Sequence, residues 1–401
     1  MAIVKNNFLS RGKISVSLIL ALTILIMFIG DAFSKYLVYK ESSFTGVSLF
    51  LRFIFESIVL VTIAKNITKI QNNNLILLVL LSVFYLIGQT ILLHNVNYTY
   101  NIIANLILYN KYIYIFIVFI FLKYLTFSFN NIERILYIIF IFNAIFILIG
   151  VIFEVELFKT AIGKEYRFGY NGLISASANE SAFIIVLSII FFYFKTFFIE
   201  KKISLSFIFI IITSLFVGQK TIYLFLLLLT IYHILHFLTI KNIPKYSLIF
   251  FATTYIAILF FNSEEFDIYF SYFIYAIDKF DFITMLLGGR NDIILKEFPE
   301  VISNWNILNL FIGGRDNELY IMESEYLDLF LSFGILGTII YLFVFYNLYI
   351  YKIKHSFLKF MLFSLLLIAM FSGHFFTSAV TALYFNFIYL FIYEKVRNNE
   401  T

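Results

Sequence analysis

The chain has 401 residues, of which 62% are hydrophobic and only 13% are charged. Soluble domains carry roughly 25% charged and about 45–50% apolar residues, so this composition excludes a water-soluble globular protein. The net charge of +5 is modest, and the absence of cysteine excludes disulfides, thiolate catalysis and cysteine-ligated metals.

Apolar runs recur along the whole chain at lengths suited to a bilayer, which a helix crosses with about 20 residues. Lys5, Arg11 and Lys13 precede the first run, and no small-residue cleavage site follows it, so we interpret this run as an uncleaved first span. The predicted spans are 14–30, 44–64, 75–93, 102–122, 135–153, 173–194, 203–217, 221–238, 246–261, 326–349, 358–372 and 376–393. The expected fold is therefore all-α: a single integral membrane domain, residues 1–401, with about 12 transmembrane helices.

Residues 203–238 could form one helix, but at about 1.5 Å per residue it would be roughly 54 Å long, against a hydrocarbon core of about 30 Å. We therefore place a break at Gly218-Gln219-Lys220. With this break and a cytoplasmic N-terminus, each of the seven inner segments carries at least two Lys or Arg residues, whereas two outer loops carry none. This is the positive-inside pattern, and it predicts that both termini are cytoplasmic.

The long segment 262–325, between the ninth and tenth predicted spans, is expected to form a large outer (periplasmic) loop. It holds the only tryptophan, Trp305, together with Pro299 and two Gly-Gly-Arg triplets. The other loops are short, and one long loop on an otherwise minimal membrane protein is usually functional.

Four basic residues are predicted near helix ends on the outer side: Arg167, Lys220, Arg290 and Arg315. Guanidinium groups suit phosphate because their planar donor fork binds it bidentately. The alternative interpretation of each is an interfacial anchor to lipid headgroups. As a set, they favour a site for an anionic substrate.

Carboxylates gather at the outer mouth of the tenth span, where Glu323, Glu325 and Asp328 lie within six residues. Glu325 and Asp328 would share a helix face, whereas Glu323 would point elsewhere. A half-buried carboxylate of this kind can act as a general base, but acids also favour this position as helix caps. His374, predicted between the last two spans on the same side, is a further candidate.

Several charged residues fall inside predicted spans, where charge is costly and indicates function by default. Asn179 and Glu180, early in the sixth span, are candidates for substrate binding. Arg52 and Glu56, four residues apart in the second span, are interpreted as an intrahelical ion pair.

No histidine pair has convincing metal-ligand spacing. His233 and His236 are interpreted as interfacial residues on the cytoplasmic side.

Four local patterns, in this order and on this side of the membrane, resemble the O-antigen polymerase and O-antigen ligase superfamily of bacterial envelope enzymes. They are Arg167-x-Gly169-x-Asn171 before a helix that opens with Asn179, the turn Gly218-Gln219-Lys220-Thr221, the pair Gly289-Arg290, and Glu323 eleven positions before Gly334-Ile335-Leu336-Gly337. Ligases typically have His followed by Asn at the last position. Glu323 followed by Ser324 therefore favours a polymerase, and Lys220 in place of Arg keeps the charge but loses the fork.

The resemblance implies an enzyme of the bacterial inner membrane that polymerises oligosaccharide repeat units carried on undecaprenyl diphosphate, which would be both donor and acceptor. It implies inverting glycosyl transfer without a metal or another cofactor. Glu323 would take the proton, with Glu325 or His374 as alternates, while Arg167, Lys220, Arg290 and Arg315 would hold the diphosphate. Expected partners are membrane lipid and a chain-length regulator protein, but no nucleic acid.

Two alternatives remain open. A flippase for the same lipid-linked oligosaccharide would share the hydropathy, although it needs charges deep in two pseudo-symmetric bundles and no large outer loop. The sister ligase would use the same donor, and Glu323 weighs against it only mildly.

Overall fold

The computed structural model describes residues 15–42, 46–70, 73–95, 102–162, 169–174, 177–237, 290–316 and 322–400. Within these ranges the chain is helical, and its one β-bridge joins Lys159 to Tyr170. The helices are α1 (Val16–Tyr39), α2 (Val47–Lys65), α3 (Ile67–Ile70), α4 (Asn73–Asn95), α5 (Ile102–Tyr124), α6 (Asn130–Phe153), η2 (Glu156–Phe158), α7 (Ala178–Phe194), η3 (Lys195–Glu200), α8 (Leu205–Leu215), α9 (Lys220–Phe237), α13 (Arg290–Ser303), α14 (Ile307–Ile312), α15 (Glu325–Phe345), η5 (Tyr346–Ile350), α16 (Ser356–Ser372) and α17 (Ala379–Glu400).

The helices confirm an all-α, polytopic membrane architecture. Among the described residues, eight helical segments are long and apolar enough to cross a bilayer: α1, α2, α4, α5, α6, α7 with η3, α9, and α15 with η5. The apolar helices α8 and α16 are shorter. The gap between α8 and α9 falls at the predicted break. The count of twelve stays a prediction, and the expected span 246–261 lies outside the described residues.

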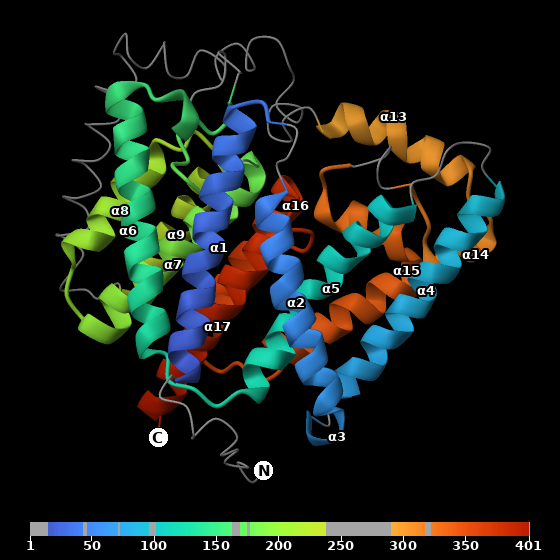
Figure 1. Ribbon diagram of the computed structural model, residues 1–401, viewed down its shortest axis with the longest axis horizontal. Helices are drawn as coiled ribbons and strands as arrows, with labels where there is room; N and C mark the ends of the chain where they lie inside the picture. The colour runs from blue at the N-terminus through green and yellow to red at the C-terminus, as the bar shows by residue number, and fades with distance from the viewer. Residues whose placement is uncertain are drawn as a thin grey trace.

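Figure 1 shows that α1 begins and α17 ends at the lower end of the molecule, whereas α13 lies across the upper end. Helix α7 is the most enclosed of the eight segments, and every residue from Ser181 to Phe194 is buried. It packs against α8, α9 and α17, and α17 packs in turn against α5. The centre of the bundle is therefore built around α7 and α17.

Much of the aromatic content fills this helix bundle. Tyr341 of α15 donates a hydrogen bond to the Tyr112 carbonyl of α5 at 3.0 Å, and Tyr349 donates to the Ile115 carbonyl, also at 3.0 Å. Both tyrosines are buried. Each ring thus supplies apolar packing while its hydroxyl finds the partner that a buried polar group requires.

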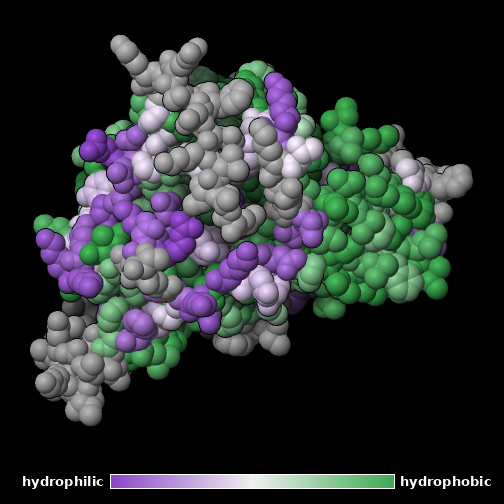
Figure 2. Space-filling view, turned by 90° about the horizontal axis from the view of Figure 1, so that it is seen from below, coloured by the Kyte–Doolittle hydropathy of each residue, from purple (hydrophilic) through white to green (hydrophobic). Residues whose placement is uncertain are grey.

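The outer surface of the bundle is apolar where lipid is expected. Figure 2, seen from below, shows hydrophobic residues spread over the side formed by α4 and α14, and hydrophilic residues gathered over the rest of the lower end. On α4, Ile76 is 72% exposed and Val79 is 63% exposed, and on α14 Ile307 is 74% exposed. Lipid contact accounts for apolar side chains that water would not tolerate in such a large patch.

Part of the predicted outer loop does not lie free but folds back against two spans. After α14 the chain turns at Gly313, which packs against Gly88 of α4 and Gly334 of α15. A Cβ on Gly88 would lie 2.7 Å from the Gly313 carbonyl oxygen, so this approach requires glycine. Gly334 is nine residues after Glu325, roughly 14 Å along α15. The turn therefore reaches well below the helix ends.

At the same level α15 is interrupted. Gly334 has φ 63° and ψ −169°, outside the helical region, within an otherwise helical segment. Only glycine adopts such a backbone at low cost. The kink in α15 lies where the Gly313 turn packs against it, so the two features belong together.

Two sequence predictions about charged residues need correction. The first span does not stop at Gly30, because α1 continues to Tyr39 and carries Asp31 and Lys35 as helical residues. Nor do Arg52 and Glu56 pair with each other. Arg52 forms an ion pair with Asp31 of α1, and Glu56 accepts a hydrogen bond of 2.7 Å from Asn110 of α5. Arg52 and Glu56 therefore each have a partner on a neighbouring helix and do not pair with each other.

Candidate active site at the upper end

Arg290, the first residue of α13, joins three segments at the upper end. Its Nε donates to the Glu323 carboxylate at 3.2 Å, its Nη1 donates to the Phe371 carbonyl, and its Nη2 donates to the Ser372 carbonyl at 3.5 Å. These carbonyls belong to the last turn of α16. The last carbonyls of a helix have no N–H partner within the helix, and they lie at the negative end of the helix dipole. Within the described part of the chain, these bonds use three of the five guanidinium N–H donors.

Glu323 is the more open member of this pair, since its side chain is 44% exposed and that of Arg290 is 10% exposed. Its backbone is left-handed, with φ 52°, as is that of His374, with φ 68°. Non-glycine residues are uncommon in this region, and such strain concentrates at functional sites. Gly373 (φ 55°), the residue before His374, packs closely against Glu323. A Cβ on Gly373 would be 3.0 Å from the Glu323 carbonyl oxygen. The fold therefore holds Glu323 beside the turn that carries His374.

Glu325 has a different environment, although only two residues separate it from Glu323. It is buried, and its carboxylate accepts three backbone hydrogen bonds from the turn before α17: from Phe375 at 3.2 Å, Phe376 at 2.6 Å and Thr377 at 3.0 Å. These bonds occupy both carboxylate oxygens. Glu325 therefore bonds to a segment outside its own helix, and it fixes the turn that bears His374.

Two of the sequence motifs, which are far apart in the chain, lie side by side. Residues 169–172 run along the turn 216–218, with the Tyr170 amide donating to the Phe216 carbonyl at 2.9 Å. Gly169 (φ 129°) packs against Val217 and Gly218 with no room for a side chain. The first two of the four patterns are thus in direct contact.

Ser372 links the second pattern to Arg290 of the third, and Arg290 pairs with Glu323 of the fourth. Thr221, in the first turn of α9, donates to the Ser372 hydroxyl at 3.0 Å, and the Ser372 carbonyl accepts from Arg290. Lys220 precedes Thr221 and is half-buried at the start of α9. Ser372 thus joins the first turn of α9 to Arg290 at the end of α16, where Arg290 also pairs with Glu323 and the turn that carries His374 begins.

Arg315 lies apart from this group in a buried ion pair. It is 1% exposed, and its Nη1 donates to the Asp328 carboxylate. Asp328 also accepts from the Met322 amide at 3.0 Å. Burial acts to lower the pKa of the Arg315 guanidinium, but the charge and hydrogen bond of Asp328, together with the nearby Tyr112 and Tyr85, raise that pKa above its usual range. Arg315 therefore stays charged and engaged with the protein itself.

The remaining predicted residues are distributed as follows. Asn179 and Glu180 occupy the first turn of α7 and are half-buried. Glu180 lies close enough to Asp31 and Arg52 to interact with both electrostatically. Arg167 lies outside the described residues.

Sequence reasoning missed Lys35, which is 1% exposed. Its ammonium donates to the Asn171 side chain and, at 2.7 Å, to the Gly172 carbonyl. Asn143 of α6 holds the same segment by donating to the Asn171 carbonyl at 3.1 Å and accepting from the Leu173 amide at 2.8 Å. The signal was available in the spacing of Asp31 and Lys35, one helical turn apart directly after an apolar run.

No group of three His, Asp or Glu side chains within the described ranges is arranged to hold a metal ion. Comparison of the chain with known protein families, characterised proteins and solved structures finds no match. The chemistry is therefore argued from the side chains. A half-exposed carboxylate pairs with a guanidinium, beside the turn that carries an imidazole and near the first turn of α9, which carries an ammonium. This set can accept a proton and stabilise an anionic leaving group.

Proposed function

We propose that the protein polymerises oligosaccharide repeat units carried on a polyprenyl diphosphate, by inverting glycosyl transfer at the outer face of a bacterial inner membrane. The observation that carries the proposal is the pairing of Glu323 with Arg290 at a membrane-helix end, beside His374. A lipid-linked donor is already activated, so the protein needs only to orient two substrates, take one proton and stabilise one anion.

In the proposed step, a hydroxyl of the acceptor sugar attacks the anomeric carbon of the donor from the face opposite the diphosphate. The new C–O bond forms as the bond to the diphosphate breaks, and the bonding pair leaves with the diphosphate. Glu323 takes the hydroxyl proton. The charges of Arg290 and Lys220 stabilise the departing diphosphate, with Arg167 as a third cation expected from the sequence.

The proposed orientation rests on the basic inner segments and on the alternation of the helices. The upper end, with Arg290 and Glu323, then faces outward, and both termini face the cytoplasm.

The test uses variants that keep the local hydrogen bonds. Glu323→Gln still accepts from Arg290 but takes up no proton, and Arg290→Lys keeps the charge but loses the fork. Lys296→Ala, an exposed lysine of α13, is the matched control. In a deletion host, wild type and the control should restore the ladder of surface polysaccharide, whereas Glu323→Gln should leave a single repeat. A normal ladder from Glu323→Gln at wild-type protein level would remove Glu323 from its assigned role.

One observation favours a second candidate, a flippase for the same lipid-linked oligosaccharide. Asp31, Lys35 and Arg52 bring buried charge into α1 and α2, and intramembrane charges often mark a transport path. Gene deletion separates the two functions. Loss of the ladder with one repeat retained at the surface supports polymerisation, and loss of all surface repeats supports a flippase or a ligase.

A further inference from the structure

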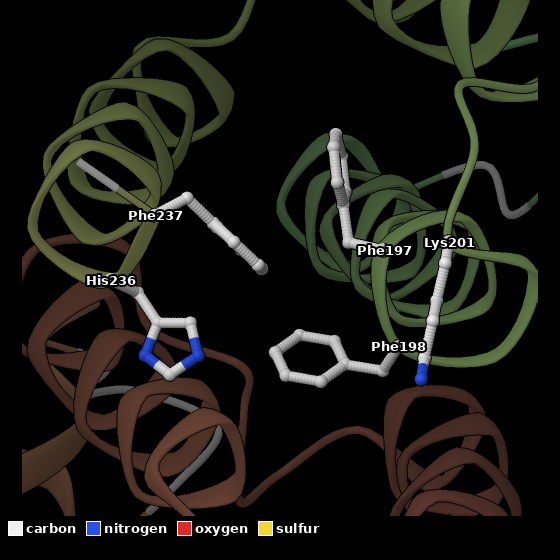
Figure 3. Close-up of a pocket in the computed structure, with 5 residues that line it drawn as sticks. All are labelled: Phe197, Phe198, Lys201, His236 and Phe237. Atoms are coloured by element: carbon white, nitrogen blue, oxygen red, sulfur yellow. The ribbon is translucent and has the colours of Figure 1, made fainter. Parts of the chain in front are cut away.

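A pocket of about 500 Å³ opens at the lower end of the molecule, whereas the candidate active site lies at the upper end. It is lined by Phe197, Phe198, Lys201, His236 and Phe237. Figure 3 shows the aromatic rings and the imidazole around the opening, with the first three residues on the η3 side and the other two on the last turn of α9. Neither the predicted mechanism nor the candidate active site uses these residues.

The local backbone explains why the pocket exists. Helix α7 ends in the π-helical turn η3, which is wider than an α-turn and often occurs at functional sites. Lys201 then reverses the chain with a left-handed backbone, φ 52°. This geometry presents Phe197 and Phe198 in succession toward α9, where their rings lie 5.7 Å from Phe237 and 5.8 Å from His236 respectively.

The pocket is basic as well as aromatic. Its lining has one ammonium and one imidazole but no carboxylate. In the described part of the chain, the neighbouring Lys195 pairs with Glu133 at 2.9 Å, whereas no carboxylate lies within ion-pair distance of Lys201. The loop 351–355 adds two further lysines, and the His355 ring lies 5.2 Å from Phe198.

We propose that this pocket binds the phosphate headgroup of an anionic phospholipid from the leaflet at the lower end. Lys201 would pair with the phosphate, and His236 can donate a ring N–H to it in either protonation state. The three phenylalanines supply an apolar wall for the glycerol and the first methylenes of the acyl chains. Clustered basic residues at membrane-helix ends attract anionic lipid, and the aromatic wall suits an amphiphile better than a free anion. This proposal is independent of the proposed enzymatic function.

The experiment measures lipid retention on the full-length protein by native mass spectrometry, with phosphatidylglycerol and phosphatidylcholine offered in equal amounts. The variants are Lys201→Gln and the double variant Lys201→Gln/His236→Gln. Lys202→Gln is the control, because Lys202 is exposed and adjacent but does not line the pocket. Inorganic phosphate in the same assay distinguishes a lipid site from a free-anion site. Because Lys201 is exposed, its single variant should keep the wild-type melting temperature.

We expect wild type and Lys202→Gln to retain phosphatidylglycerol in preference to phosphatidylcholine. Lys201→Gln should reduce the retained fraction by roughly five-fold, and the double variant further. The proposal is overturned if the double variant retains phosphatidylglycerol like wild type, or if Lys202→Gln loses as much as Lys201→Gln. It is also overturned if inorganic phosphate displaces the lipid completely at comparable concentration.

Discussion

Replacing Arg315 with methionine should destabilise the protein strongly, because the ion pair of Arg315 with Asp328 is buried. Arg315 is 1% exposed, and the Asp328 side chain is 9% exposed. Methionine fills a similar volume without charge, so the change isolates the loss of the guanidinium. What remains is an aspartate that keeps the Met322 amide as a partner but loses its cation.

The expected magnitude follows from the difference between breaking and replacing such a pair. Removing one partner from a buried ion pair typically costs about 3–5 kcal/mol, because an uncompensated charge remains. Replacing both partners with apolar residues is often close to neutral. Arg315→Met should therefore lower the free energy of unfolding by about 3–5 kcal/mol. The double variant Arg315→Met/Asp328→Leu should recover much of this lost stability. It should not recover the part due to the hydrogen bond between the Met322 amide and Asp328.

The assay is thermal unfolding of purified wild type, both single variants and the double variant in one detergent, completed as a double-mutant cycle. A coupling free energy near zero would refute the reasoning, as would an Arg315→Met variant as stable as wild type. The second outcome, combined with lost polysaccharide synthesis, would instead return Arg315 to the diphosphate-binding role predicted from the sequence.

Three further predictions concern single backbone or side-chain contacts. Gly313→Ala should lower the melting temperature, since φ is 78° and the new Cβ would meet the backbone of α15, whereas Gly46→Ala, with nothing within 4 Å, should not. Glu325→Leu should prevent accumulation of folded protein, seen by size-exclusion chromatography, because two buried amides and a third, partly buried one lose their acceptor, and each buried amide left unbonded costs about 1–3 kcal/mol. Lys35→Met should speed amide hydrogen exchange across residues 169–174 relative to Lys40→Met, an exposed lysine just beyond the same helix.

The sequence was sufficient for the helical class because composition alone excludes water as the solvent of the bundle. The break between α8 and α9 was also predictable, since the bilayer thickness limits the length of a span and Lys220 lies at the only polar interruption. Helix ends were less predictable. The apolar run stops at Gly30, but α1 continues because Asp31 and Lys35 find partners on other segments.

Side-chain partners were the part that the sequence could not determine. Local spacing made Glu56 the obvious partner of Arg52, and the structure gives Arg52 to Asp31, 21 positions away. Local spacing also grouped Glu323 with Glu325, yet one is paired with Arg290 and half-exposed while the other is buried among backbone amides. Contacts between distant segments decide the environment of a charge inside a bundle, and one sequence does not specify them.

The two Gly-Gly-Arg triplets are identical in sequence, but their arginines lie in different environments. Arg290 follows Gly-Gly at the start of a helix and reaches the carbonyl end of α16, where it donates to the Glu323 carboxylate and to the Phe371 and Ser372 carbonyls. Arg315 follows Gly-Gly at a turn packed between α4 and α15, where Asp328 neutralises it in a buried setting. An arginine serves an anionic ligand only if the fold leaves part of its fork accessible. The Arg290 side chain is 10% exposed and that of Arg315 only 1%, so Arg290 is the residue to test for diphosphate binding and Arg315 the residue to test for stability.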